Sequence, residues 1–365
     1  MGFLKNYKII LTTKTPIHIG MNCTISKKDY IIEKDKVLVF DNNKLIDFAF
    51  DNNLLDSLEK YYRDYKMTLK KWFNENNISK SEQAALIAYK ADIHFDIKDS
   101  NIRNINSFIK DVYKQPYVPG SSLKGTLKNS IFSYIIANYG IKQKVVNDIE
   151  NIAKNSKNRG ALNREMAKVG RGVQKCIFEQ CKGELFSDEI DSNFMRYIRI
   201  SDSKPLRVED LIICGRTEMF VNKPNIQLPI YIECIKPNTK IEFDMTIDQE
   251  LVQFIDNHFI MDAINHTLDI YNTKYLSNYS KVKKFDNNII FIGGITGFHI
   301  KTVLKDIFEK EKLVDVTSNI LAKVAPRHKH KNDYKLKVSP RAVKINNSDS
   351  EINHMGACSI EIIPK

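Results

Sequence analysis

Tyr117-Val-Pro-Gly-Ser-Ser-Leu-Lys-Gly-Thr-Leu-Lys128 joins the end of a predicted strand to the start of a predicted helix through a turn of small residues. Pro119 fixes its own φ, and Gly120 allows an unusual one. Ser121 or Ser122 is expected to cap the helix, because a serine hydroxyl accepts a hydrogen bond from a free N–H at a helix start. The apolar side of this helix is predicted to consist of Leu123, Leu127, Ile131, Ile135 and Ile136.

The same turn is predicted to bind an anion. Free N–H groups at a helix start, with Lys124 and Lys128 one turn apart, suit a phosphate. A Walker loop would need Gly-Lys-Ser/Thr after four residues, whereas Gly125 is followed by Thr126 and Leu127. We therefore expect a nucleic-acid backbone as the ligand. The alternative is that the turn only caps and packs a core helix.

Length and composition set the broad class. The chain has 365 residues, and about 150 residues per domain predicts two domains. The formal net charge of +12 and the pI of about 9.1 favour a polyanionic partner. No apolar segment is long enough to suggest a membrane span, so the protein is expected to stay in the cytoplasm.

The basic residues gather in two stretches, 159–182 and 323–344. The second holds eight lysines and arginines against the single acid Asp333. Within it, Arg327 and Lys329 are predicted to hold a nucleic-acid backbone on a mobile basic loop. Each stretch has the alternative interpretation of a solvated surface.

No metal site or cofactor is predicted. The six cysteines are scattered, and most stand beside apolar neighbours, which is typical of reduced, partly buried thiols. Cys176 and Cys181 lack a second Cys or His pair at the spacing that a closed zinc site needs.

The order of the predicted elements indicates an α+β protein. Strands are predicted at 7–13, 29–32, 37–40, 195–200, 229–235, 240–247 and 356–363, and an apolar run lies at 211–214. Helical insertions are predicted at about 44–92 and 141–195. Each half of the chain has strands followed by a strand, a glycine turn and a helix. We therefore predict two related domains, 1–215 and 216–365, the second carrying a glycine turn and the basic loop.

The second glycine turn follows a predicted strand and precedes a predicted helix. Its candidate residues for binding a nucleic-acid backbone are Gly293, Gly294, Gly297, His299 and Lys301. The alternative is a tight turn that only packs a strand against a helix.

Two arginines of the predicted strand 195–200 are further candidates. Arg199 is expected to contact nucleic acid or another protein chain, and one of the pair Arg196 and Arg199 to lie buried in an ion pair. Asp202 is expected to cap the turn that follows, because a lone carboxylate in a turn usually accepts local N–H groups.

Five motifs occur in an order that resembles a known family. They are Pro16-Ile-His-Ile-Gly20, Val118-Pro-Gly-Ser-Ser-Leu-Lys-Gly125, Ile198-Arg-Ile-Ser-Asp-Ser-Lys-Pro205, Tyr231-Ile-Glu-Cys-Ile235 and Gly293-Gly-Ile-Thr-Gly-Phe-His-Ile-Lys-Thr302. This set is similar to the RAMP superfamily and, within it, to the fifth subunits of Csm effector complexes of type III-A CRISPR systems. The chain departs from many of these relatives at Ile295, where they carry glycine, and at His299.

The resemblance implies two ferredoxin-like, RRM-like RAMP domains with helical insertions. It implies an RNA-binding subunit without catalytic activity that caps the 3′ end of the guide RNA and supports its 3′-end maturation in antiviral and anti-plasmid defence. The implied partners are guide RNA, the other Csm subunits, chiefly the RAMP filament subunit, and cellular 3′ exonucleases. No cofactor is implied.

Two other functions stay open from the sequence. Some RAMP proteins are metal-independent endoribonucleases that process guide precursor RNA, and His18 with Tyr30 would supply the acid and base. A protein scaffold that binds no RNA is the third possibility.

Overall fold

Strand β1 (Leu4–Thr13) lies at the centre of a five-stranded sheet with the order β11-β14-β1-β10-β7. The other strands are β7 (Ile198–Ile200), β10 (Lys240–Asp248), β11 (Ile289–Phe291) and β14 (Ala357–Pro364), and all neighbours are antiparallel. Tyr7, Ile9 and Leu11 are buried on one face of β1, because successive side chains of a strand point to opposite faces. The computed structural model describes residues 4–94, 104–186, 190–347 and 352–365.

A second sheet of nine strands runs in the order β2-β6-β9-β8-β5-β4-β3, and β12 joins β13 to β8. Its strands are β2 (Gly20–Ser26), β3 (Tyr30–Glu33), β4 (Lys36–Phe40), β5 (Ile87–Ile93), β6 (Asn104–Phe108), β8 (Leu211–Phe220), β9 (Lys223–Ile235), β12 (Ala342–Asn347) and β13 (Ile352–His354). The pairs β5–β8 and β6–β9 are parallel, and the other pairs are antiparallel.

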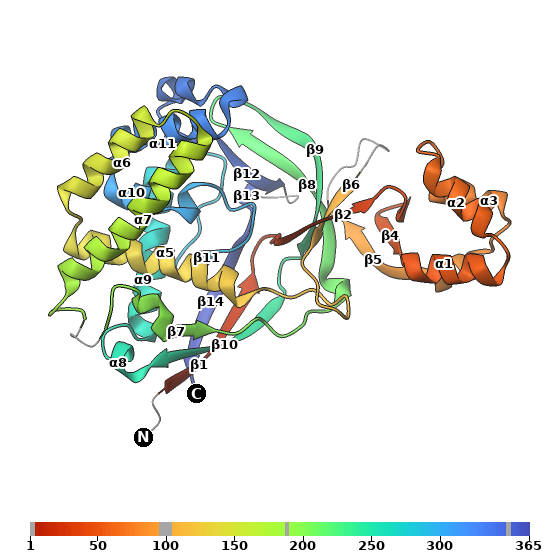
Figure 1. Ribbon diagram of the computed structural model, residues 1–365, viewed down its shortest axis with the longest axis horizontal. Helices are drawn as coiled ribbons and strands as arrows, with labels where there is room; N and C mark the ends of the chain where they lie inside the picture. The colour runs from red at the N-terminus through yellow and green to blue at the C-terminus, as the bar shows by residue number, and fades with distance from the viewer. Residues whose placement is uncertain (1–3, 95–103, 187–189, 348–351) are drawn as a thin grey trace.

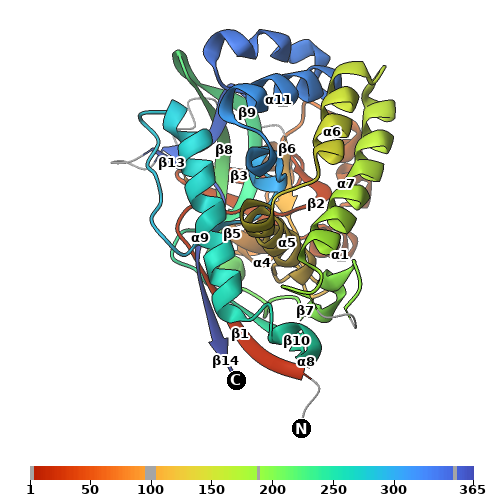
Figure 2. The same ribbon diagram turned by 90° about the vertical axis from the view of Figure 1, so that its left-hand side faces the viewer.

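Helices α5 (Gly120–Tyr139) and α9 (Asn257–Lys274) pack against each other beside the five-stranded sheet, and a helical layer lies on the side of α5 away from α9 (Figures 1 and 2). That layer consists of α6 (Gln143–Asn155), α7 (Arg159–Cys181) and α11 (Lys310–Val324). The largest hydrophobic core joins β1 and β10 to these helices, and it contains every apolar residue predicted for α5. Short helices α8 (Gln249–Val252) and α10 (Leu304–Ile307) complete the body.

Four helices form a small unit that projects away from the rest of the molecule (Figure 1). They are α1 (Asn42–Asp51), α2 (Leu55–Arg63), α3 (Leu69–Glu75) and α4 (Lys80–Ala85). The unit has its own core, in which the rings of Tyr61 and Trp72 are fully buried. The predicted helical insertion at 44–92 is therefore helical only as far as Ala85, because Ile87–Ile93 pairs with β4 and β8 as strand β5.

The predicted boundary near residue 215 falls inside β8. Each sheet takes strands from both sides of that residue, since β1 pairs with β10 and β14, and β5 pairs with β8. The division at 215 thus does not coincide with the division between the sheets. The predicted α+β class is confirmed. No helix within the described ranges is both long and apolar enough to cross a membrane.

Candidate nucleic-acid interface

Helix α5 begins at Gly120, but its start is capped by a distant residue and not by the two serines. Pro119 occupies the N-cap position with φ −60° and ψ 133°. The Gly120 N–H donates to Asp202 Oδ1 at 2.8 Å, and the Val118 N–H donates to Ser203 Oγ at 2.9 Å. The predicted capping by Ser121 or Ser122 is wrong, because the loop after β7 supplies the acceptors. Both serines therefore keep hydroxyls at the surface of the helix start.

The two glycines of this segment have different roles. A Cβ on Gly120 would lie 2.2 Å from the Ser201 carbonyl oxygen and 2.5 Å from that of Ile200. Gly120 is thus required for the close approach of α5 to the end of β7. A Cβ on Gly125 would meet nothing within 4 Å. Only Gly125 therefore leaves backbone open at the surface.

We expect Gly120→Ala to lower the free energy of unfolding by about 2 kcal/mol, because the added methyl forces a backbone carbonyl to move. Gly125→Ala is the matched control, and it should raise that free energy by about 0.5–1 kcal/mol, since alanine favours a helix interior. Urea unfolding of both variants measures the difference. Equal stabilities would contradict the close packing at Gly120.

Three cations lie together near the start of α5. Lys124 is partly exposed and has no hydrogen-bond or ion-pair partner among the described residues. Burial, Arg199 and Lys128 all lower the pKa of its ammonium group. Lys128 donates to Gln174 Oε1 at 3.0 Å, and burial lowers its pKa as well. An unpaired ammonium beside two further cations attracts an anion.

The arginines near β7 differ from the prediction. Arg196 belongs to the 3-10 helix η1 (Phe194–Tyr197) and not to the strand, and it pairs with Asp191 at 2.9 Å. Arg199 lies in β7 and donates to both oxygens of Asp248 at 2.8 and 3.2 Å. Both arginine side chains are more than half exposed, so the prediction of one buried ion pair is wrong. Arg199 is accessible to a ligand.

The second glycine turn packs against the segment that contains His18. Gly293 has φ +104°, and its Cα lies so close to this segment that a Cβ would be 2.4 Å from the His18 carbonyl oxygen. The Gly294 N–H donates to the same oxygen at 2.8 Å. Gly297, with φ +90°, has open space at its Cβ position. The turn leads into the one-turn 3-10 helix η4 (His299–Lys301) and not into the predicted longer helix.

The two glycine segments are neighbours in space. Asn129 of α5 donates through Nδ2 to the Ile300 carbonyl at 3.4 Å. Lys301 is exposed, and its ammonium donates to the Gly294 carbonyl at 3.1 Å while burial lowers its pKa. The structure thus places Lys301 next to a residue that contacts α5. The sequence alone did not show this proximity.

His299 is a buried structural residue. Its Nε2 donates to the Ser339 carbonyl at 2.6 Å, and its ring packs against Tyr275 with centroids 4.7 Å apart. Burial lowers its pKa to about 4, so the imidazole is neutral near pH 7. The predicted RNA contact of His299 is wrong, because the ring is only 2% exposed. Ile295 is also buried, in a small cluster with Ile212 and Met355.

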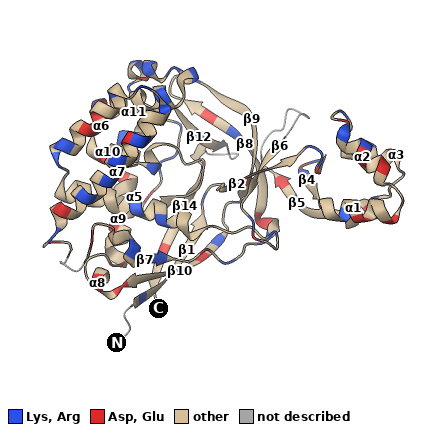
Figure 3. Cartoon of the chain, in the orientation of Figure 1, with Lys and Arg blue, Asp and Glu red and all other residues tan. Residues whose placement is uncertain are grey.

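Arg327 and Lys329 are exposed at the end of α11. Two 3-10 helices, η5 (Pro326–His328) and η6 (His330–Leu336), form the segment that was predicted as a mobile loop. Buried Asp333 organises it by accepting hydrogen bonds from His330 Nδ1 at 2.9 Å and Ser339 Oγ at 2.8 Å. In Figure 3, lysines and arginines are spread over α6, α7 and α11 with acidic residues between them.

The proposed acid–base pair of an endoribonuclease is not displayed at the surface. His18 and Tyr30 are both less than a tenth exposed. His18 Nδ1 donates to the Glu233 carbonyl at 2.7 Å, and burial lowers the pKa of its ring. Burial raises the pKa of Tyr30.

Glu233 is a buried charged residue that the sequence analysis did not single out. Its carboxylate accepts hydrogen bonds from the Phe108 N–H at 2.9 Å, from Lys110 Nζ at 2.5 Å and from the Tyr89 hydroxyl. Its backbone carbonyl holds His18. The signal was present, because Glu233 stands alone among apolar residues in Ile230–Ile235. Glu233 thus ties β9, β6 and β5 to the segment behind the second glycine turn.

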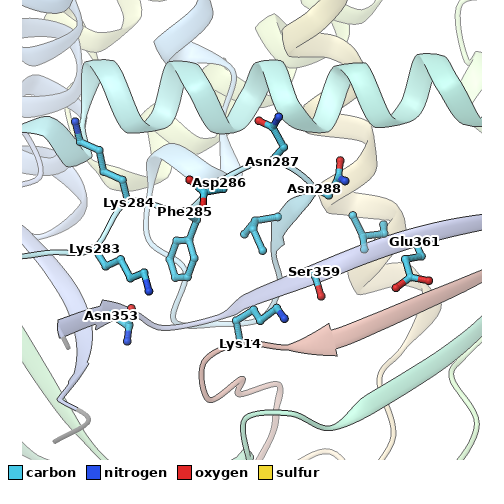
Figure 4. A pocket seen from close by; sticks show the side chains of 12 residues that line it. Lys14, Lys283, Lys284, Phe285, Asp286, Asn287, Asn288, Asn353, Ser359 and Glu361 are labelled. Carbon is cyan, nitrogen blue, oxygen red and sulfur yellow. The ribbon is translucent and has the colours of Figure 1, made fainter. Parts of the chain in front are cut away.

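A pocket of about 520 Å³ lies elsewhere, beside β11 and β14 (Figure 4). Lys14, Lys283, Asp286 and Glu361 bring charges of both signs to its lining. None of the predicted RNA-binding residues, all of which the structure describes, lines this pocket. In the described part of the chain, no three His, Cys, Asp or Glu residues come together as a metal site would require.

Comparisons with known proteins agree with the resemblance noted in the sequence. The CRISPR system Cms protein Csm5 of Mycobacterium tuberculosis is 24% identical over 99% of this chain and 98% of its own length. The protein of the same name from Streptococcus thermophilus is 25% identical over 82% of this chain and 81% of its own.

Two solved structures share the fold. A chain of the cryo-EM structure of a Csm–crRNA–target RNA ternary complex in a type III-A CRISPR-Cas system has a TM-score of 0.59 at 15% identity, over 97% of this chain and 100% of that chain. The crystal structure of T. onnurineus Csm5 has a TM-score of 0.57 at 17% identity, over 96% of this chain and 99% of that chain. The RAMP superfamily model matches residues 10–326. The chain therefore belongs to the RAMP superfamily.

Proposed function

We propose that this protein is the RNA-binding fifth subunit of a type III-A Csm effector complex and caps the 3′ end of its guide RNA. In this role it contacts the 3′ portion of the guide, docks against the RAMP filament subunit, and works in the cytoplasm. It supports 3′-end maturation by recruiting cellular 3′ exonucleases rather than by cutting. The similarity to Csm5 proteins over nearly the whole chain supports this assignment.

The observation that carries RNA binding is the unpaired Lys124 beside Lys128 and Arg199 at the start of α5. These three cations come from two elements that the Gly120 contact holds together. Such charges attract phosphates without reading bases, which suits a guide whose sequence varies. The burial of His18 and Tyr30 supports a subunit that binds RNA without cleaving it.

We expect Lys124→Ala/Lys128→Ala to weaken binding of single-stranded guide RNA about tenfold or more at moderate salt, because two phosphate contacts are lost. The slope of log K against log salt should become shallower by about 0.7 per lost contact. Fluorescence anisotropy at several salt concentrations measures both quantities. Arg327→Ala/Lys329→Ala tests the basic segment after α11 separately.

Lys70→Ala/Lys71→Ala is the matched control, because it removes the same charge from the exposed surface of α3 in the projecting unit. Its RNA affinity should stay close to that of the unchanged protein. If Lys124→Ala/Lys128→Ala and Lys70→Ala/Lys71→Ala lost the same amount of RNA affinity, the loss would be a general effect of charge, and this would contradict a site at α5. No RNA binding by the unchanged protein would favour the scaffold, and RNA cleavage lost in His18→Ala would favour the endoribonuclease.

A further inference from the structure

A second group of cations lies where β8 and β12 meet the second glycine turn. Lys344 of β12 is paired in register with Glu218 of β8, and Arg216 lies two residues before Glu218. Side chains at alternate positions of a strand share a face, so these three side chains lie on one face. The opposite face carries Val343 and Ile345, which belong to a hydrophobic core.

Within the described part of the chain, Lys344 has no anionic partner on this face. Glu218 lies directly opposite in register, but its carboxylate accepts from Arg216 Nη2 at 2.5 Å, and no ion pair joins it to Lys344. Among the described residues, Lys344 Nζ has no hydrogen-bond or ion-pair partner. The Arg216 Nε is also buried without a partner in this part of the structure. Lys344 Nζ is thus left for a ligand, and the Arg216 guanidinium has one donor that no described acceptor satisfies.

A third cation approaches from the glycine turn. Lys301 of η4 donates a hydrogen bond from Nζ to the Gly294 carbonyl at 3.1 Å. Its positive charge also repels that of Lys344. Burial, Arg216 and Lys301 together lower the pKa of Lys344 to about 8, and Glu218 raises it only slightly. Three cations with one carboxylate leave a surplus of two positive charges in a partly buried place. Such a surplus is unfavourable unless an anion binds.

We propose that Lys344, Arg216 and Lys301 form a binding site for an RNA phosphodiester next to the second glycine turn. The inference rests on the proposed RNA-binding function and adds a site on β8 and β12 to the one at α5. A phosphodiester is the favoured anion because its two free oxygens can accept hydrogen bonds from several cationic side chains at once. Such contacts do not depend on the base sequence of the RNA. The surplus of basic residues in the whole chain favours the same class of partner over an acidic protein segment.

The site should reveal itself by its pH dependence. The phosphate binds the ammonium form of Lys344, which is lost as the pH rises through about 8. RNA affinity should therefore fall up to about tenfold between pH 7 and pH 9. Among the described residues, the other charged or titratable groups that interact electrostatically with Lys344 are Arg216, Glu218, Lys301 and the buried His354, whose pKa of about 3 keeps it neutral in this range.

The test compares Lys344→Arg and Lys344→Met in the full chain with single-stranded RNA as the probe. Lys344→Arg should keep the affinity at pH 7 and lose the additional decrease between pH 7 and pH 9, because arginine does not titrate there. Lys344→Met should bind several-fold more weakly at pH 7, with a shallower salt dependence. Its unfolding midpoint should be unchanged or higher, because the folded protein disfavours this charge.

The outcomes separate this site from the proposed function. If the unchanged protein binds RNA and Lys344→Met binds equally well with the same pH profile, the site is refuted while the proposed function stands. If the unchanged protein does not bind RNA, the proposed function fails and this inference fails with it.

Discussion

Gly293→Ala is expected to lower the free energy of unfolding by about 3 kcal/mol or more, because two separate penalties meet at this position. Its φ of +104° is unfavourable for any residue with a Cβ, and that Cβ would lie 2.4 Å from the His18 carbonyl oxygen. The oxygen cannot retreat freely, since it accepts the Gly294 N–H at 2.8 Å. Urea unfolding with an unchanged m-value would measure the loss.

Gly297→Ala separates the two penalties. Gly297 has a similar φ of +90°, but open space surrounds the position of its Cβ. This variant should therefore show only the backbone penalty, about 1–2 kcal/mol. If Gly293→Ala were no less stable than Gly297→Ala, the contact with the His18 segment would not limit the turn. The RNA affinity of each folded variant, compared with that of the unchanged protein, would test separately whether the turn binds RNA.

The second large effect is expected for Glu233→Ala, which should destabilise the protein by about 3–5 kcal/mol. The carboxylate is fully buried, and its removal leaves the Lys110 ammonium, the Tyr89 hydroxyl and the Phe108 N–H without their acceptor. A buried charge that loses its partner costs far more than an exposed one. Thermal and urea unfolding would both detect the change.

Two variants control for the role of the charge. Glu233→Gln keeps an oxygen for the Phe108 N–H but no longer neutralises Lys110, so an intermediate loss is expected. Glu59→Ala breaks the exposed ion pair with Arg63 and should change the stability by about 0.5 kcal/mol or less. A loss in Glu233→Ala as small as that in Glu59→Ala would mean that the buried network contributes little. The double variant Lys110→Met/Glu233→Met would then also have a free energy of unfolding close to that of the unchanged protein.

The packing of the interior explains why His299, a predicted RNA contact, is buried. His299 lies within a glycine-containing segment that does turn at the surface, yet its side chain is drawn inward by the Ser339 carbonyl 40 residues later in the chain. Lys344, in contrast, was counted only as part of a basic stretch. Its pairing with β8 is what sets it beside Arg216. Charge composition predicted a polyanionic partner, whereas tertiary contacts decide which of the described cations lack a hydrogen-bond or ion-pair partner.

The sequence by itself determined the elements whose signals are local. The apolar spacing of Leu123, Leu127 and Ile131 predicted the buried side of α5, and the alternation in 7–13 and 240–247 predicted β1 and β10. The ordered motifs predicted the superfamily. The helix and strand signals depend on residues within one or two turns of each other or on adjacent strand positions, so no knowledge of distant contacts was needed for them.

Only the tertiary structure decided how these helices are capped and how these strands pair. Asp202 caps α5 from 82 residues away, β1 lies between β10 and β14, and residues 87–93 become a strand because β4 and β8 flank them. Hydrogen-bond partners and burial at such separations follow from the packing of the whole chain, which overrides local preference. The same packing buries His299 and, among the described residues, leaves the ammonium groups of Lys124 and Lys344 without a hydrogen-bond or ion-pair partner, which is why the proposed anion sites include these two lysines.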